Sequence, residues 1–395
     1  MNHAYILDAA RTAIGTFGGS LSSMAPNQLA APLVSRCLER SGIEPLDVNE
    51  VILGCVLQAG HGQNVARQAA VAAGIPFETI AMTVNMVCGS GLMSVITAAR
   101  AIALGEADLI VAGGTECMSQ APYVLSKARY GYRMGNGELV DTMIRDGLWD
   151  AFRDYHMGRT AENLASRYGI GREEQDNFAA ESQAKAQRAI QAGRFNDEIV
   201  PLKIVQPKGE PIDFARDEAP RFGTTPQALG KLRPAFQEGG TVTAGNSSGI
   251  GDGAAIVLVA SERFVVKKKL RPMARIVSHG CSGAAPEVMG IAPVGAVRHA
   301  LHAAGWAVGD LKLIEANEAF AVQALAVGRE IAWDPTLVNV NGGAIALGHP
   351  IGASGARILV TLLHEMRKKQ ATRGLATLCV GGGMGVAMCV EMEKS

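Results

Sequence analysis

Short apolar runs alternate with stretches of helical periodicity over residues 1–120. The pattern predicts strands at 5–7, 50–53 and around Thr83, with helices near 27–41 and 63–73 between them. Strands that alternate with helices in this way are typical of the α/β fold class, which we therefore expect for this chain.

The stretch 83–92 is distinctive because its apolar run stops at a cysteine and a Gly-Ser-Gly turn follows. Beyond Gly89, apolar residues recur every three or four positions along one helical face, and Gly105 is placed to end that helix. The next strand is expected at 108–114. The members of the apolar face are Leu92, Val95, Ile96, Ala99 and Ile102.

Cys88 is thus predicted to lie at a helix N-terminus. Free backbone N–H groups and the positive end of the helix dipole favour a thiolate there, and such sites lower a cysteine pKa from about 8.5 to roughly 3.5–7.5. The alternative is that Cys88 is a small buried hydrophobic residue, as free cysteines in apolar runs commonly are. This stretch alone leaves both interpretations open.

An internal repeat relates the last third of the chain to this region. Residues 41–47 and the strand after them match 304–310 and its strand, at an offset of about 263 residues. At nearly the same offset, Ser90-Gly91 corresponds to Ser354-Gly355, and Gly113-Gly114 corresponds to Gly381-Gly382 with a few residues inserted. The ordered matches favour a duplication, and hence two α/β halves related by a pseudo-twofold axis.

Between the halves the composition changes. From residue 121 to about residue 248 the chain is rich in Pro, Gly and charge, with an amphipathic helix at 172–192 and few β-branched runs. A buried strand at 253–260 then returns to the first half, and the basic run 267–271 is interpreted as a solvated linker. We expect a first half at 1–120 rejoined by 249–270, an inserted loop domain at 121–248, and a second half at 271–395.

Three further patterns occur in the second half. Asn317 ends an apolar run, His349 lies in a Gly-rich loop just before a helix, and Cys379 ends a strand before a run of glycines. Singly, a histidine or a Gly-rich turn is more often structural. Because equivalent loops of two related halves face one another, however, Cys88 and the His349 loop should meet. Together the residues predict a Cys/His nucleophilic site.

Two other motifs are set aside. Residues 245–249 match the Gly-x-Ser-x-Gly elbow of hydrolases, but a Gly-rich segment and a strand follow where that elbow needs a helix. Residues 381–385 follow a strand as a dinucleotide-binding loop does, yet the glycine spacing differs. Only about ten residues remain after them, too few for the helix, strand and acidic residue of that unit.

Charge and cysteine content narrow the class of protein further. Lys+Arg and Asp+Glu are both 37, so no overall field attracts nucleic acid or an anionic membrane. Seven cysteines without Cys-x-x-Cys spacing indicate neither a disulfide framework nor a zinc site, and no metal ligand is assigned. The sequence shows neither a signal-peptide pattern nor an uninterrupted apolar run of about 18 residues, so a cytoplasmic protein is expected.

The sequence resembles the thiolase family, and within it the bacterial acetyl-CoA acetyltransferases, from about residue 7 to the C-terminus. The resemblance implies two α/β halves in a five-layered α/β/α/β/α arrangement with an inserted loop domain that covers the CoA site, and commonly a homotetramer. It is carried by four motifs in family order: Asn85-x-x-Cys88-x-Ser-Gly91, Asn317-Glu-Ala-Phe320, Gly342-Gly-Ala-Ile-Ala-Leu-Gly-His349-Pro-x-Gly-x-Ser-Gly355 and Cys379-x-Gly-Gly-Gly-x-Gly385.

The resemblance also implies a reaction, the reversible Claisen condensation of two acetyl-CoA molecules to acetoacetyl-CoA and CoA. Cys88 would accept the acetyl group after His349 takes its proton, and Cys379 would deprotonate the methyl group of the second acetyl-CoA. Asn317 would orient a water that, with His349, stabilises the enolate oxygen. The backbone N–H groups of Cys88 and Gly381 would hold the acyl-enzyme carbonyl. No tightly bound cofactor is expected, since CoA is substrate and product.

Contacts with CoA are carried over from the resemblance residue by residue. His156 and Ser248 resemble residues that touch the pantetheine arm, and Arg221 resembles one near the nucleotide, although an ordinary surface charge is its alternative. Ala228 departs from relatives that have a serine contacting CoA there. The acyl pocket would be closed by Met289 and Phe320, with Met157 nearby; ordinary core packing is the alternative for all three.

Other functions stay open at this point. A degradative 3-ketoacyl-CoA thiolase would share the chemistry but accept longer chains. A ketosynthase would need a histidine where Asn317 stands. A thiolase-like lipid-binding protein without turnover should lack one of the four reactive residues, and none is missing. The physiological direction does not follow from the sequence, because one site catalyses both directions.

Overall fold

The computed structural model describes residues 3–205 and 210–393 of the chain. Its main strands fall in two groups. The first half contributes β1 (Ala4–Arg11), β2 (Gly15–Thr16), β3 (Glu50–Gly54), β4 (Ile80–Val84), β5 (Leu109–Cys117) and β12 (Gly251–Ser261). The second half contributes β13 (Ala274–Gly283), β14 (Leu313–Ala316), β15 (Arg373–Val380) and β16 (Met384–Met392). The strands expected in the first half are therefore confirmed.

Within the described residues these ten strands form one sheet, in the order β14-β15-β16-β13-β1-β12-β5-β3-β4 with β2 paired to β12. β3 runs parallel to β4 and β5, and β14 runs parallel to β15, whereas β12 pairs antiparallel with β1 and β5. Residues 253–260, which lie in β12, thus pair with two strands of the first half. Pairing of β1 with β13 joins the two halves.

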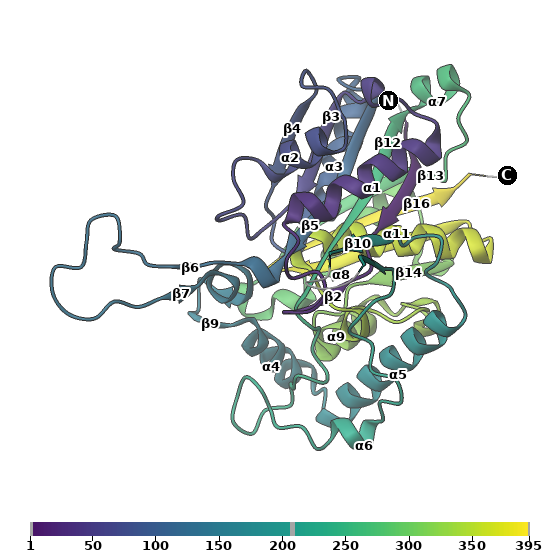
Figure 1. Ribbon diagram of the computed structural model, residues 1–395. Helices are drawn as coiled ribbons and strands as arrows, with labels where there is room; N and C mark the ends of the chain where they lie inside the picture. Colours follow the sequence, from purple (N-terminus) through teal and green to yellow (C-terminus); the bar gives the residue numbers. More distant parts are fainter. Residues whose placement is uncertain (1–2, 206–209, 394–395) are drawn as a thin grey trace.

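Helices cover both faces of each half, which gives the expected five layers (Figure 1). α1 (Pro26–Ser41) and α2 (Val65–Ala72) pack with the first half in one apolar cluster, and α8 (Pro293–Ala304) and α9 (Ala321–Ile331) pack with the second half in another. The central layer consists of α3 (Ser90–Leu104) and α11 (Ile351–Lys369), which contact each other and both halves. Alternate residues of β5 enter the outer and central clusters, as the period of a strand requires.

Burial between two halves explains why α3 is so apolar. The stretch Val87–Leu104 has the length and hydropathy of a membrane span, and it is the single such stretch among the residues described. Its side chains lie in the cluster shared with α11 and the sheet, and most of them are buried. The helix begins and ends as the sequence predicted, with Gly105 in a left-handed conformation after its last residue.

The repeat brings two small residues into contact across the central layer. Gly91 of α3 and Gly355 of α11, which correspond in the repeat, each face the backbone of the other helix. A Cβ on Gly91 would lie 2.8 Å from the Ala356 nitrogen, and one on Gly355 would lie 2.4 Å from the Leu92 nitrogen. Helix backbones this close leave room only for glycine at both positions.

Segment 121–248 holds helices and short hairpins rather than strands of the large sheet. The predicted amphipathic helix is α5 (Arg172–Gln191), and the segment also contains α4 (Met157–Tyr168) and α6 (Pro226–Leu229). A hairpin with β6 (Tyr123–Val124) and β7 (Val140–Asp141) projects away from the rest of the molecule (Figure 1). Two further hairpins pair β8 (Trp149–Asp150) with β9 (Tyr155–His156), and β10 (Leu202–Ile204) with β11 (Ile212–Phe214).

The basic run 267–271 is only partly the linker that the sequence suggested. Its first two lysines belong to α7 (Glu262–Lys268), which Ser261 caps by accepting a hydrogen bond from the Phe264 N–H at 3.1 Å. Phe264 is buried against the first half, so the helix is held in place by packing. The helix ends at Lys268 and is followed by Lys269, which has a left-handed backbone. The linker is therefore shorter than the sequence suggested.

Candidate active site

Cys88 lies in a tight turn between β4 and α3. Val87, just before it, has a φ of 45°, a region that β-branched residues rarely adopt. The Asn85 Oδ1 accepts a hydrogen bond from the Val87 N–H at 2.9 Å, and Ser90 bonds the turn from the first residue of the helix. The Cys88 side chain is partly exposed and packs against an apolar cluster that includes Ile351, two residues after His349.

The helix N-terminus favours a thiolate at Cys88 but does not decide the state of this thiol. Burial raises the pKa of the thiol to about 11, although the backbone N–H groups of Gly381 and of Cys88 itself lower it. The buried Glu116 carboxylate raises it slightly further. Desolvation therefore outweighs the helix terminus, and the resting group is a thiol that needs a base.

His349 lies in the loop between α10 (Ala344–Leu347) and α11, held by its own N–H, which donates to the Gly249 carbonyl at 2.8 Å. Burial lowers its pKa to about 3, and the charge of Arg357 lowers it further, so the ring is neutral near pH 7. Its Nδ1 lies 2.5 Å from the Ser354 Oγ, whose hydrogen is donated to the Pro350 carbonyl at 2.8 Å. The hydroxyl therefore accepts from Nδ1–H, which leaves Nε2 unprotonated and able to act as a base.

Asn317 follows β14 and faces the same ring. Its Nδ2 lies 3.5 Å from His349 Nε2, and its backbone N–H donates to the Thr377 carbonyl on β15 at 2.9 Å. The Oδ1 of Asn317 is buried and has no hydrogen-bond partner among the described residues. A buried amide oxygen in that state is a natural position for a water molecule.

Cys379 is the second thiol of the site, near the end of β15 and almost fully buried. Burial raises its pKa strongly, and the neighbouring Cys88 raises it further. Gly381 follows two residues later and directs its backbone N–H at the Cys88 sulfur. The structure thus brings together the residues singled out for chemistry: Cys88, Asn317, His349, Cys379 and Gly381.

Apolar side chains line the region beside Cys379. Met157, Met289 and Phe320 belong with Cys379 to one buried cluster. Phe236, which the sequence analysis missed, packs against this cluster and stacks on His156 with ring centroids 4.7 Å apart. It also meets Phe320 edge to face at 6.1 Å. No periodicity or motif marks Phe236 in the sequence.

The three residues proposed to contact CoA lie on separate parts of segment 121–248. The His156 Nδ1 accepts the Gly158 N–H at 3.1 Å, so Nε2 carries the hydrogen of the neutral ring. Ser248 is half-buried, and its N–H donates to the Ala319 carbonyl, next to Phe320, at 3.0 Å. Arg221 is exposed, and Ala228 lies in α6, also exposed.

Glu116 is a buried carboxylate beside the site, and the sequence analysis did not single it out. Its carboxylate accepts the N–H groups of Val56, Leu57 and Gly352 at 3.0, 3.1 and 2.9 Å. Burial raises its pKa to about 7, while these N–H groups lower it. The carboxylate ties the loop after β3 to the first turn of α11, directly behind His349 and Cys88.

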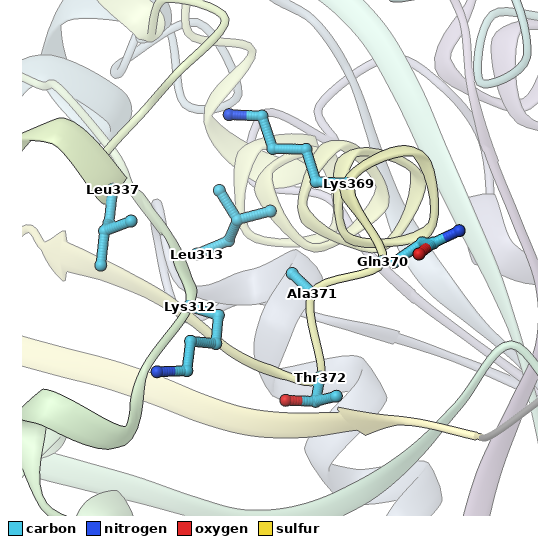
Figure 2. A pocket seen from close by; sticks show the side chains of 7 residues that line it. All are labelled: Lys312, Leu313, Leu337, Lys369, Gln370, Ala371 and Thr372. Atoms are coloured by element: carbon cyan, nitrogen blue, oxygen red, sulfur yellow. The ribbon is translucent and has the colours of Figure 1, made fainter.

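Other parts of the molecule offer less for chemistry. A surface pocket of about 360 Å³ lies at the C-terminal end of α11, where the Lys312 and Lys369 side chains flank Leu313 and Leu337 (Figure 2). It contains none of the residues predicted for the site. In the ranges 3–205 and 210–393, no three His, Cys, Asp or Glu side chains are grouped so as to hold a metal ion.

Comparison with known proteins agrees with the geometry. The family model described as thiolase, N-terminal domain, matches residues 4–263, and that described as thiolase, C-terminal domain, matches residues 270–392. The acetyl-CoA acetyltransferases of Pseudomonas aeruginosa and Cupriavidus necator are 59% and 56% identical over 393 residues, which is 100% of each chain.

Two solved structures are similar over the whole chain. The acetyl-CoA acetyltransferase of Bacillus anthracis has a TM-score of 0.97 at 44% identity, and human mitochondrial 3-ketoacyl-CoA thiolase has a TM-score of 0.96 at 41% identity. Each alignment covers 100% of this chain and 99% of the other.

Proposed function

Because the chain belongs to the thiolase family, we propose that it is an acetyl-CoA C-acetyltransferase that condenses two acetyl-CoA molecules reversibly to acetoacetyl-CoA and CoA. The observation that carries this proposal is the pairing of two neighbouring thiols, the partly exposed Cys88 and the buried Cys379, with a neutral imidazole whose Nε2 is unprotonated. The similar proteins that are named acetyl-CoA acetyltransferase support the same activity.

Acetyl transfer to the enzyme begins at Cys88. His349 Nε2 takes the thiol proton, the bond from Sγ to the acetyl carbon forms, and the bond from that carbon to the CoA sulfur breaks. Cys379 gives its proton to the departing CoA sulfur. The backbone N–H groups of Cys88 and Gly381 both lower the pKa of the Cys88 thiol and so lie near its sulfur, where they can stabilise the oxyanion of the tetrahedral intermediate.

Carbon–carbon bond formation then uses the Cys379 thiolate. Because burial raises the pKa of this thiol, its thiolate is a strong base and can remove a proton from the methyl group of the second acetyl-CoA. The resulting carbanion attacks the acetyl group, and Cys88 leaves as a thiolate that recovers its proton from His349. A water on the free Oδ1 of Asn317, together with His349, stabilises the enolate oxygen.

The substrate site extends from the reactive residues along segment 121–248. His156 and Ser248 border the pantetheine arm and Arg221 meets the nucleotide, while Met157, Met289 and Phe320 limit the acyl group. The stacking of Phe236 on His156 adds a further wall. Coenzyme A enters and leaves as substrate and product, and no tightly bound cofactor takes part.

A degradative 3-ketoacyl-CoA thiolase is the second candidate, because a human enzyme of that name has nearly the same fold. The two bulky methionines and the phenylalanines beside Cys379 favour a short acyl group instead. Rates on acetoacetyl-CoA and 3-ketohexadecanoyl-CoA, measured with free CoA, separate the two. Equal or better turnover of the long substrate would sink the assignment to acetyl-CoA.

We further propose a homotetramer in the cytoplasm. β4 ends the sheet with Ile80 and Met82 65% and 40% exposed, and an open edge of this kind suits pairing with a second copy. The projecting hairpin exposes Tyr130 and Met134 almost completely and offers a second contact.

The proposed cytoplasmic location rests on the cysteines, since seven free cysteines fit a reducing compartment. Acyl-CoA molecules are the partners that the proposed reaction requires. The balanced charge creates no overall field that would attract nucleic acid or an anionic membrane, so neither is proposed as a partner.

Mass spectrometry after incubation with acetyl-CoA tests the roles of the two thiols. Cys88→Ala should take up no acetyl group and lose both directions of the reaction. Cys379→Ala should still acetylate at Cys88, because the CoA thiolate is a good leaving group and can take its proton from water instead of from Cys379. Condensation and thiolysis should fall by about 10²–10⁴, the usual worth of a positioned acid or base. Cys37→Ala, buried against the first half, is the control and should leave both activities intact. An acetyl group on Cys379 with Cys88 unlabelled would refute the assignment.

A further inference from the structure

The turn that presents Cys88 is strained, and the Ser90 hydroxyl supplies two of the hydrogen bonds that hold it. The Val87 carbonyl also accepts the Ser90 backbone N–H at 3.1 Å, and the Met86 carbonyl accepts the Gly89 N–H at 2.9 Å. A left-handed φ at a β-branched residue such as Val87 costs roughly 1–3 kcal/mol and persists only where neighbouring groups impose it. The Ser90 Oγ accepts the Met86 N–H at 2.8 Å and donates to the Val87 carbonyl at 2.6 Å. One side chain thus bonds the Asn85–Met86 peptide group, one unit before the strained residue, and the Val87–Cys88 peptide group directly after it.

The second of these bonds bears directly on the reaction. The Val87 carbonyl and the Cys88 N–H belong to the same planar peptide group, so a hydrogen bond that fixes the carbonyl also fixes the direction of the N–H. Donation to a carbonyl also polarises its peptide group, which makes the N–H a better donor. The Cys88 N–H lowers the pKa of its own thiol and so lies near the sulfur, where the acyl carbonyl would be held.

We propose that Ser90 is a positioning residue, whose hydroxyl aims the Cys88 N–H at the oxyanion formed during acetyl transfer. The proposal rests on the proposed function of Cys88 as acyl acceptor. Ser90 touches neither substrate nor sulfur and acts only through the Val87–Cys88 peptide group.

Packing leaves the Ser90 hydroxyl no alternative position. Its side chain is fully buried at the start of α3, and a Cβ on Gly54 would lie only 2.6 Å from the Ser90 Cβ. The backbone of β3 therefore closes off the space behind it. The exposed Asn85, which accepts the Val87 N–H, is a second and weaker brace on the same turn.

The test compares two reactions of the same sulfur, acetylation by acetyl-CoA and alkylation by iodoacetamide. Acetylation passes through an oxyanion and alkylation does not, so only acetylation needs the aimed N–H. In Ser90→Ala we expect the ratio of the acetylation rate to the alkylation rate at Cys88 to fall by about 10- to 100-fold, somewhat less than the loss of an oxyanion donor itself. Both rates are measured well below the melting temperature of each variant, because an unfolded chain is alkylated at Cys88 but not acetylated.

Ser94→Ala is the matched control. Ser94 lies one turn along α3, is equally buried, and bonds the Gly91 carbonyl and both the carbonyl and the N–H of Gly113. Its loss should lower the melting temperature about as much as Ser90→Ala but leave the ratio unchanged. Asn85→Ala, at an exposed position that folding tolerates, should lower the ratio by a smaller factor.

Four outcomes would overturn the proposal. If both rates in Ser90→Ala equalled those of the wild type, the hydroxyl would not aim the donor. If both rates fell by the same factor, the ratio would again be unchanged and the effect of Ser90 would lie on the thiol. An equal loss of the ratio in Ser94→Ala would show a general effect of loosening α3. A wild-type protein that is alkylated at Cys88 but takes no acetyl group there would refute the proposed function, and this inference with it.

Discussion

Ser354 accepts a hydrogen bond from His349 Nδ1 at 2.5 Å while donating its own hydrogen to the Pro350 carbonyl. Because the hydroxyl has a single hydrogen, this pair of contacts selects the tautomer of His349 in which Nε2 is unprotonated. Nε2 is the nitrogen that faces Asn317. The chemistry proposed for His349 therefore depends on a serine five residues further along the chain.

Replacing Ser354 tests this dependence. In Ser354→Ala the neutral ring can exchange its hydrogen between the two nitrogens, so kcat should fall by about 10- to 100-fold while KM for acetyl-CoA changes little. Steady-state kinetics of thiolysis measure both. Thr361→Ala is the control, because Thr361 is a buried hydroxyl of the same helix that bonds Glu198 instead. A comparable loss of kcat in the control would mean that the effect comes from α11 as a whole.

The pKa shifts predict how the reactivity of Cys88 varies with pH. A thiol with a pKa raised to about 11 is protonated below that pH, and a histidine with a pKa lowered to about 3 is neutral above it. The rate of iodoacetamide alkylation at Cys88 should thus rise by about tenfold per pH unit between pH 6 and 9. A rate that stays constant across neutral pH would contradict this, because it would indicate a preformed thiolate–imidazolium pair.

Arg221 provides a test of CoA recognition far from the reacting carbon. Its backbone N–H is held by the Gln183 Oε1 at 2.8 Å, which leaves the exposed side chain free to meet the nucleotide. Arg221→Ala should raise KM about tenfold, the worth of a charge-assisted contact of about 1.5 kcal/mol, with kcat nearly unchanged. Arg263→Ala, an exposed arginine of α7 paired with Asp108, should change neither constant. A large fall in kcat without a change in KM would instead connect Arg221 with the chemistry.

Much of this arrangement could be predicted because its signals are local. The strands and helices of the first half follow from the spacing of apolar residues, and Gly105 ends α3 as glycines commonly do. The repeat added a long-range inference, since it implied that Cys88 and the His349 loop face each other. That contact could not follow from either segment alone.

What the sequence did not predict depends on burial and on distant partners. The pKa of Cys88 is raised because the second half covers a helix N-terminus that would otherwise lower it. Phe236 stacks on His156, a residue 80 positions earlier, and no local pattern marks such a pair. The spacing rule for helix neighbours does not mark Ser354 either, because His349 precedes α11 and the two residues are five positions apart.

The contact between Gly91 and Gly355 gives a prediction for stability. Alanine normally stabilises a helix by about 1 kcal/mol relative to glycine, so Gly355→Ala would be favourable if α11 were exposed. Here the new methyl group would lie 2.4 Å from the backbone nitrogen of Leu92. This nitrogen is part of the backbone of another helix, so it cannot move aside as the end of a flexible side chain could. Overpacking of this kind typically costs 1–3 kcal/mol, and the clash should outweigh the gain in helix propensity.

Thermal unfolding at fixed protein concentration measures the balance. Gly355→Ala should lower the melting temperature by several degrees, because one kcal/mol corresponds to roughly 2–4 °C in a large domain. Gly309→Ala is the control, since a Cβ there would meet no atom within 4 Å and its φ is not left-handed. That variant should melt within about a degree of the wild type. If Gly355→Ala matched the control, the two central helices could move apart freely, and their close packing would not be what fixes the two halves against each other.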